Sequence, residues 1–377
     1  MSLPDVALDV ESILSLDTID DPQSLEWPKR FIARELGWIP TFDLERTDAH
    51  GLYGGQVIAQ TVWAACQTVS DGFDVHSTHG YFLRPGNSQE RIVYNVFEVR
   101  TGRNYATRRV EAVQFDKVIY TSFANFKRDF AAQLASEDPS IRHGLPYPTD
   151  TWYPKYSDIT KLPRNPDVDL PALHEFKSYW KMPINYRKFP MDKINARKER
   201  VHERRQLHFF RSRYEVSNKT HNFQAVVLMY SSDRNFLFTA TNAHLATDEL
   251  TFGHVASLDH SMIIHQSLGT PSSPGTTASA LFHAHRTARP RQIKSKDRSE
   301  EWITYDTQAL AAGNSRCLVT GYMWDKRGRH LATVMQEALA DVNVVGPRQE
   351  PAAAATRGKS AAFSKESRLK TKYASKL

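Results

Sequence analysis

The chain has 377 residues, of which 40% are apolar and 24% are charged; this composition excludes a disordered or fibrous protein, and the length favours two or three structural units. The net charge of +7 could indicate nucleic-acid binding, but the charge is concentrated at one end of the chain. Residues 346–377 hold eight Lys or Arg against two Glu and so supply +6 of it. A basic tail on a nearly neutral body is a weak sign of nucleic acid, and none is expected as a partner.

Two further classes of protein are disfavoured at the outset. No run of about 18 or more apolar residues occurs, so no membrane-spanning helix is expected, and the acidic N-terminus lacks the basic start and apolar core of a secretory signal. The two cysteines, Cys66 and Cys317, each lie in an apolar-patterned segment. A disulfide between them stays open, but two buried free thiols in a reducing compartment are the favoured interpretation.

The first predicted unit runs from about residue 41 to 128. A short strand is expected at 41–47, and apolar residues at helical spacing predict a helix, buried on one side, over 54–69. Alternating apolar residues between turn signals then predict three or four strands, over 75–85, 91–100, 105–114 and 117–126.

The second predicted unit, from about 207 to 340, has the same internal order. A strand at 207–216 and a helix at 221–237 precede four more strands, over 255–264, 302–310, 317–325 and 330–339. The two halves can be aligned turn for turn, which indicates an internal duplication of one strand–helix–strands unit. Two such copies can form a continuous sheet and act as a built-in dimer.

Three stretches lie outside these units. Residues 129–206 are a connection rich in Pro, Lys and Arg, and residues 267–299 have the Ser, Thr, Gly and Pro content of a flexible inserted loop. The third is the basic tail, 346–377, which ends in Ser375, Lys376 and Leu377. A C-terminal Ser-Lys-Leu is a peroxisomal address that an import receptor reads at an accessible end. A chance match is the alternative, but the flexible tail favours a targeting signal and the peroxisomal matrix as the location.

Familiar hydrolase and cofactor motifs are missing from the sequence. It contains no G-x-S-x-G, no H-E-x-x-H, no paired cysteines of a zinc site and no glycine-rich phosphate loop. His260 and His265 lie near an Asp, but their spacing is not that of metal ligands, and core or surface histidines are the simpler interpretation.

Longer motifs resemble those of the acyl-CoA thioesterase II family. They are LYGGQVIAQ (52–60), HSTHGYFLRPG (76–86) and VRTGRNYATRRV (99–110) in the first half, and YSSDRNFL (230–237), ASLDHSM (256–262) and QE (336–337) in the second. The resemblance covers about 25–128 and 205–340. It implies an α+β double hot-dog fold, in which two helix-wrapped antiparallel sheets in one chain form a pseudo-dimer. The implied domains are 25–128, a linker 129–206, a second unit 207–345 that carries the insertion 267–299, and the tail 346–377.

The same resemblance implies three catalytic residues, Asp233, Ser257 and Gln336, all in the second unit. A carboxylate can activate water, and a hydroxyl with an amide can orient that water, which together suit hydrolysis of fatty acyl-CoA to a fatty acid and CoA without metal or organic cofactor. In the repeat alignment the first unit offers Ala124 at the place of Gln336 and a small residue near Cys66 at the place of Asp233. One competent site per chain is therefore expected, in an enzyme of fatty acid and lipid metabolism.

Two alternatives remain open. A hot-dog enoyl-CoA hydratase would need an Asp/His pair near a helix start, and the helix starts at 54–56 and 221–223 show no such Asp. A non-catalytic acyl-CoA-binding protein would explain the fold without turnover. The insertion at 267–299 and the missing aromatic at 262–265 leave acyl-chain preference undecided, and assembly as a homo-oligomer is expected.

Overall fold

The computed structural model describes residues 9–19, 26–38, 51–138, 159, 162, 183–245, 250–269 and 302–344. None of the helices within these ranges is long and apolar enough to cross a membrane. The helices are α1 (Val10–Leu14), α2 (Gly54–Cys66), α3 (Phe130–Ser136), α4 (Asp192–Asn195), the 3₁₀ helix η5 (Val201–Glu203), α5 (His221–Ser232) and α6 (Phe238–Leu245).

The strands of the first half are β1 (Leu16–Thr18), β2 (Lys29–Ala33), β3 (Phe73–Phe82), β4 (Val93–Thr101), β5 (Tyr105–Gln114) and β6 (Lys117–Arg128). Those of the second half are β7 (Ile184–Lys188), β8 (Arg205–Ser212), β9 (Leu250–Ser257), β10 (Asp259–Ile264), β11 (Ile303–Gly313), β12 (Arg316–Trp324) and β13 (His330–Val344). Each strand predicted within the described residues is present with ends that differ by a few positions, except that the one expected at 255–264 is divided into β9 and β10.

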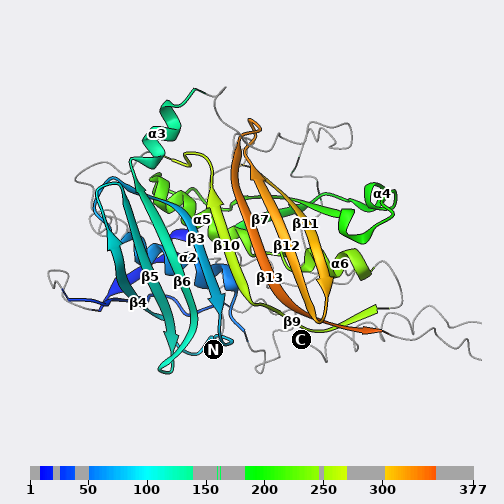
Figure 1. The fold of residues 1–377 in the computed structure, drawn as a ribbon, viewed down its shortest axis with the longest axis horizontal. Coiled ribbons are helices and arrows are strands. Elements are labelled where there is room, and N and C mark those ends of the chain that lie inside the picture. Colours follow the sequence, from blue (N-terminus) through cyan, green and yellow to red (C-terminus); the bar gives the residue numbers. More distant parts are fainter. Residues whose placement is uncertain are drawn as a thin grey trace, which may run out of the picture.

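All thirteen strands belong to one antiparallel sheet, in the order β1-β2-β4-β5-β6-β3-β10-β13-β12-β11-β8-β7, with β9 paired to β13 outside this path (Figure 1). The halves meet where β3 pairs with β10, from Asp259 opposite Tyr81 to Ile263 opposite Ser77. This pairing joins the sheets of the two halves edge to edge into one continuous sheet, which the predicted duplication allowed. Pairing β3 with β10 satisfies backbone groups that two exposed sheet edges would leave open.

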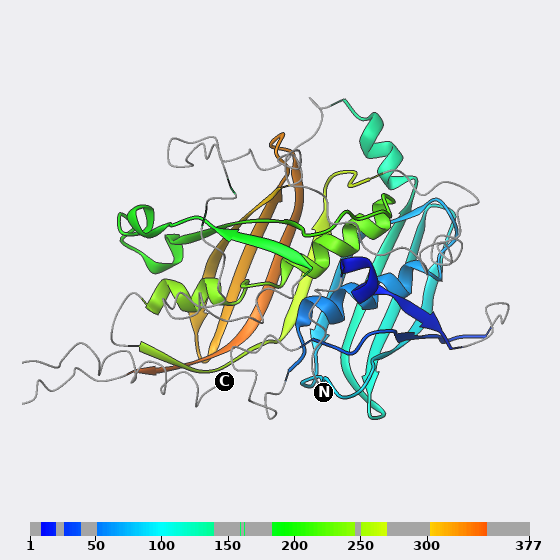
Figure 2. The same cartoon turned by 180° about the vertical axis from the view of Figure 1, so that it is seen from behind.

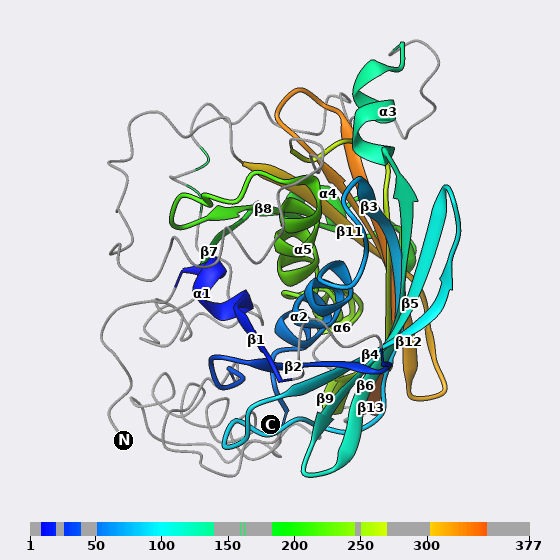
Figure 3. The same ribbon diagram turned by 90° about the vertical axis from the view of Figure 1, so that its left-hand side faces the viewer.

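Helices α2 and α5 lie side by side on one face of the sheet, as the views from behind and from the side show (Figures 2 and 3). Apolar side chains of both helices and of the sheet face beneath them form one core. The alternating exposure along β5, whose buried positions include Ala106, Val110 and Ala112, shows how period-two patterning directs one side of each strand into that core.

Helix α5 is shorter than predicted. Thr220 caps its start by accepting a hydrogen bond from the Phe223 N–H, and the helix ends at Ser232 instead of continuing to 237. Asn235 has a φ of 60°, in the left-handed region, which interrupts the helical path before α6 begins. Helix α2 likewise ends at Cys66 instead of residue 69.

Several predictions fall on or near residues that the structure does not describe. The strand expected at 41–47, most of the insertion 267–299, and the tail with its last three residues lie outside the described ranges. The strand that pairs with the outer side of β4 is β2, which was not predicted. Within 129–206 the described residues include the edge strand β7, which pairs with β8. Cys66 and Cys317 are free and buried, as favoured.

Candidate active site

The three residues predicted from the sequence meet in the structure. The Gln336 side-chain N–H₂ donates to Ser257 Oγ at 2.5 Å and to Asp233 Oδ1 at 3.3 Å. Asp233 follows the last residue of α5, Ser257 is the last residue of β9, and Gln336 lies within β13. Asp233 and Gln336 are buried and Ser257 is half-buried. The amide of β13 therefore connects the carboxylate that follows α5 with the hydroxyl at the end of β9.

A break between β9 and β10 places Ser257 beside Gln336, although the sequence predicted a single strand over 255–264. Both strands pair with β13, but Ser257 faces Ala338 whereas Ser261 faces Met335, so one extra residue is inserted on the β9–β10 side. The Glu337 N–H donates to Asp259 Oδ1 at 2.5 Å and so holds the break in place. Such a bulge redirects side chains next to a site. The sequence shows Asp259 as part of the ASLDHSM motif, but it does not indicate that this side chain binds the backbone of β13.

The start of α2, from the first half of the chain, completes the site. The Gly55 N–H donates to Asp233 Oδ2 at 2.9 Å. A Cβ on Gly54 would lie 2.8 Å from that same oxygen, and a Cβ on Gly55 would lie 2.4 Å from the Tyr230 carbonyl oxygen. Glycine is therefore required at both positions for the two helices to approach. The sequence showed these glycines as the opening of a helix, without indicating that they contact Asp233.

Burial is the largest influence on the Asp233 carboxylate and raises its pKa above the ordinary aspartate value. The hydrogen bonds from Gln336 and Gly55 and the nearby Arg234 guanidinium act in the opposite direction without cancelling it. The carboxylate is therefore a stronger proton acceptor than an exposed aspartate.

Three tyrosines that the sequence did not single out hold the end of α5. A helix leaves its last carbonyls without helical partners. The Tyr53, Tyr186 and Tyr305 hydroxyls donate to the carbonyls of residues 230, 231 and 232 at 2.5, 3.0 and 2.9 Å respectively. Burial raises the pKa of each tyrosine, so each stays protonated and able to donate. These bonds fix the turn from which Asp233 projects.

His260 supports the same turn from β10. Its Nε2 lies 2.9 Å from Ser232 Oγ, and burial lowers the pKa of the ring to about 3, which keeps it neutral. The ring is fully buried, so His260 is a core residue, as predicted. His265 is half-buried and its ring lies 4.5 Å from that of His330. The described residues contain no group of three or more His, Cys, Asp or Glu suited to a metal ion.

The corresponding corner of the first half is built differently. Counting from the helix starts, Cys66 in α2 occupies the position of Asp233 after α5, and it is a buried free thiol. At the start of α5, the Asn222 side chain accepts from the Val75 N–H at 2.7 Å and donates to the Phe73 carbonyl at 3.0 Å. The two helix junctions therefore differ in chemistry, since a thiol stands here in the place of Asp233, and the carboxylate near it, Asp74 of β3, accepts from the Ala131 N–H.

The sequence and the fold were compared with those of known proteins. Family models described as the acyl-CoA thioesterase N-terminal and C-terminal domains match residues 44–127 and 163–340. The rat protein named acyl-coenzyme A thioesterase 8 is 27% identical over 337 residues, 88% of each chain. A yeast protein named peroxisomal acyl-coenzyme A thioester hydrolase 1 is 33% identical over 116 residues, 31% of this chain and 30% of its own length.

Among solved structures, an acyl-CoA thioesterase II from Mycobacterium marinum superposes with a TM-score of 0.58. It is 26% identical and aligns over 88% of this chain and 97% of its own. A putative thioesterase II from Thermobifida fusca, 12% identical, gives a TM-score of 0.57 over 90% of this chain and 100% of its own, which shows a shared fold.

Proposed function

From the premise that this chain belongs to the acyl-CoA thioesterase II family and is an acyl-CoA thioester hydrolase with a hot-dog fold, we propose that its catalytic residues are Asp233, Ser257 and Gln336. The observation that carries the proposal is the single Gln336 amide that hydrogen-bonds both the buried Asp233 carboxylate and the Ser257 hydroxyl. The substrate class is fatty acyl-CoA. The direct test is to incubate the protein with acyl-CoA and follow release of the CoA thiol.

The proposed reaction is direct attack by water on the thioester. Asp233 removes a proton as the water oxygen bonds to the carbonyl carbon, and the C–S bond then breaks. The proton held by Asp233 passes to the sulfur of CoA, which regenerates the carboxylate. A positioned general base of this kind typically contributes about 10²–10⁴-fold to the rate. Within the described residues Gln336 Oε1 accepts no hydrogen bond, so it can accept one from the attacking water.

The start of α2 is the proposed stabiliser of the oxyanion. The first N–H groups of a helix lack helical partners and carry its positive dipole end, which favours negative charge. Tyr53, at the N-cap, provides no side-chain hydrogen bond to them. The Gly55 N–H already donates to Asp233 and the Gln56 N–H to the Tyr53 carbonyl, so the stabilisation proposed is that of the positive end of the helix dipole, which borders the place where charge develops on the carbonyl oxygen.

We expect activity to fall at acidic pH in a way that reports on Asp233. The base must be ionised, and burial raises its pKa above the ordinary value of 3.8. The acid limb of kcat/KM should therefore lie above pH 3.8, with activity lost as pH falls through the raised pKa. A pH profile measured with a neutral-chain acyl-CoA checks this. A limb at the pKa of an exposed aspartate would contradict the proposed burial of the base.

Ser257→Ala tests the hydroxyl. It removes the acceptor of the 2.5 Å bond from Gln336 and leaves a methyl group beside the water, so kcat should fall by about tenfold, the effect of about one hydrogen bond to a charged network. Ser77→Ala is the matched control, because Ser77 stands at the corresponding place in β3. Equal rates for the two variants, measured by thiol release, would remove Ser257 from the mechanism.

The hydratase alternative has some geometric basis where β3 of the first half meets the start of α5 of the second. Asp74 lies close enough to His221, at the start of α5, to act on the pKa of its ring, which burial nevertheless lowers overall. However, His221 Nε2 lies 2.9 Å from the Val75 carbonyl oxygen and Nδ1 accepts from the Leu268 N–H at 3.3 Å. Both ring nitrogens are bound to backbone, so this pair is not free to deliver water to a double bond. Hydrolysis remains the supported function.

The proposal includes a pseudo-dimer within the chain. The strand order is the same from either edge of the sheet if β1, β2, β4, β5, β6 and β3 are matched to β7, β8, β11, β12, β13 and β10. The catalytic residues lie in one half and the glycine start of α2 in the other. Neither half would then form the site alone, as is usual where a duplicated unit replaces a dimer. The whole chain is proposed to assemble further as a homo-oligomer.

The proposed location is the peroxisomal matrix. The support is the terminal Ser375-Lys376-Leu377, together with a yeast relative named as peroxisomal that matches 31% of this chain. A fluorescent protein fused before Met1 should report punctate organelles in cells. Deleting the last three residues should disperse the signal, because the import receptor reads a free C-terminus. Unchanged puncta after the deletion would show another route of targeting.

A further inference from the structure

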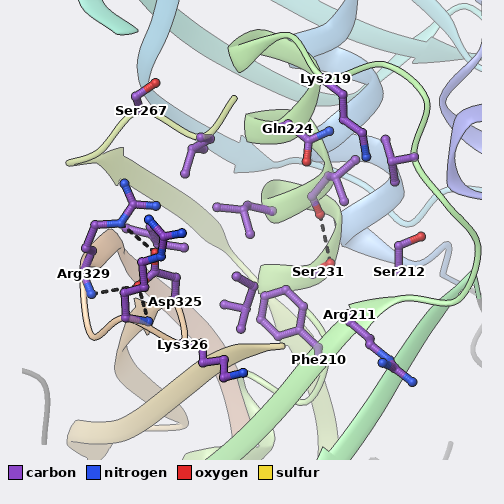
Figure 4. Close-up of a pocket in the computed structure, with 17 residues that line it drawn as sticks. Phe210, Arg211, Ser212, Lys219, Gln224, Ser231, Ser267, Asp325, Lys326 and Arg329 are labelled. Carbon is purple, nitrogen blue, oxygen red and sulfur yellow. Dashed lines mark hydrogen bonds and ion pairs between the residues drawn. The ribbon is translucent and has the colours of Figure 1, made fainter. Parts of the chain in front are cut away.

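A cavity of about 560 Å³ lies beside α5, bounded by β8, β11 and the turn between β12 and β13 (Figure 4). This volume is within the usual range for small-molecule sites. Its floor is apolar and is formed by Phe210, Val216, Val227, Leu228, Ile303 and Leu331. Such a floor favours the hydrocarbon part of a ligand.

The rim of the cavity is strongly cationic. Among the described residues that line it, the charged ones are Arg211, Lys219, Lys326, Arg327 and Arg329, together with the acid Asp325. Asp325 is already engaged, because its carboxylate accepts from the N–H groups of residues 327 and 329 and from Arg329 Nε at 2.7 Å. Five cations less the acid paired with Arg329 leave a net charge of +4 over an apolar floor, which matches a ligand that is hydrophobic along its length and anionic at one end.

This cavity is separate from the proposed catalytic residues. Gln224, Val227, Leu228 and Ser231 line it, and their spacing puts them on one face of α5. Asp233 comes two positions after Ser231, about 200° around the helix at 3.6 residues per turn. The helix therefore stands between the cavity and the carboxylate, and a ligand in the cavity does not touch the reacting atoms.

The first half of the chain fills the equivalent space with its own residues. Gln60, the seventh residue of α2, corresponds to Val227, the seventh of α5. Gln60 Nε2 donates to the Ile13 carbonyl of α1 at 2.7 Å, and Val10, Ile13 and Leu14 are buried there. The equivalent faces of α2 and α5 thus differ: α1 packs against the first, whereas the second borders an open cavity with a basic rim.

We propose that the cavity is a second, non-catalytic site for a fatty acyl chain with an anionic head. The chain lies along the apolar floor and the head is held by the cations of the β12–β13 turn. Two molecules have this chemistry, the free fatty acid that the enzyme releases and the acyl-CoA that it consumes. A ligand here contacts Ser231, whose carbonyl accepts from Tyr186, and so bears on the turn that carries Asp233.

Equilibrium dialysis with palmitate, and separately with the thioether hexadecyl-CoA, tests the site. Neither probe is hydrolysed, but both resemble the substrate or the product and also occupy the catalytic site, so the quantity measured is the second equivalent bound per chain. The exposed pair Lys326→Glu/Arg327→Glu should weaken binding of this second equivalent at least tenfold by reversing rim charge. The matched control is Lys117→Glu in the corresponding turn of the first half, and it should change binding less than twofold. The tighter of the two probes identifies the natural source.

A second variant tests the floor. Leu228→Trp fills the cavity and should remove the second equivalent while leaving the first, and a thermal melt should show a folded protein. If this variant does not fold, the rim pair decides, because its side chains are exposed. The proposal is overturned if the unaltered protein binds only one equivalent, or if both variants bind a second equivalent of palmitate and hexadecyl-CoA as tightly as the unaltered protein. It is also overturned if free CoA binds at the second site as tightly as hexadecyl-CoA, since the chain would then contribute nothing.

Discussion

Asp233→Asn should reduce kcat for acyl-CoA hydrolysis by about 10²–10⁴-fold, because an amide cannot take the proton of the attacking water. The new side chain has the same shape, so its oxygen can still accept from the Gly55 N–H, which now donates to Asp233 Oδ2 at 2.9 Å. Thiol release measured at saturating acyl-CoA gives the effect on kcat. A folded variant with an undiminished rate would remove the carboxylate from the mechanism.

The stability of the same variant should move in the opposite direction. A carboxyl group whose pKa is raised by folding favours the protonated form in the folded state, so its contribution to stability is lost as pH rises through the raised pKa. A neutral amide avoids this loss, and the melting temperature at pH 7 should be equal or higher. Cys66→Ala is the matched control at the same position of the other helix, and it should leave kcat unchanged.

Gly55→Ala should damage both folding and activity. In an ordinary helix position this change would stabilise by about 1 kcal/mol. Here the added Cβ would lie 2.4 Å from the Tyr230 carbonyl oxygen and 2.6 Å from the Tyr53 ring, so α2 and α5 must separate. Overpacking of this kind costs about 1–3 kcal/mol, and the separation withdraws the N–H that holds Asp233.

The measurements for this second variant are a denaturant melt and the rate of thiol release. We expect a lower free energy of unfolding and a fall in kcat of more than tenfold. Gly313→Ala serves as the control, since a Cβ there meets no atom within 4 Å. A Gly55→Ala protein as stable and as active as the Gly313→Ala protein would show that the close approach of the two helices is dispensable.

The turn at the end of α5 is held by side chains of several elements, so small changes there should have large effects on the rate. Its three carbonyls accept from tyrosines of three different elements, and its Ser232 hydroxyl is bonded to His260 of β10. Fixing a reacting group in this way limits the rearrangement needed when charge develops. The same bonds explain how a ligand in the cavity beside α5 could alter the rate without contacting the thioester.

Periodicity and turn signals in the sequence were sufficient to predict the strands and the two long helices, because each burial pattern is local to its own element. The repeated order of elements indicated the duplication. The motif resemblance named Asp233, Ser257 and Gln336, which the structure then placed within hydrogen-bonding distance through one amide. These features depend on residues that are near one another in the chain or that match a known motif.

Tertiary structure alone decided how the halves join and what holds the site. The β3–β10 pairing, the break after Ser257 and the contact of Gly55 with Asp233 connect residues far apart in the chain, so local patterning cannot reveal them. The tyrosine hydroxyls and the basic cavity likewise become visible only when separate elements converge. Periodicity is a property of the chain and can be read from it. Hydrogen bonds and burial are properties of the packed molecule, so the sequence alone could not predict them.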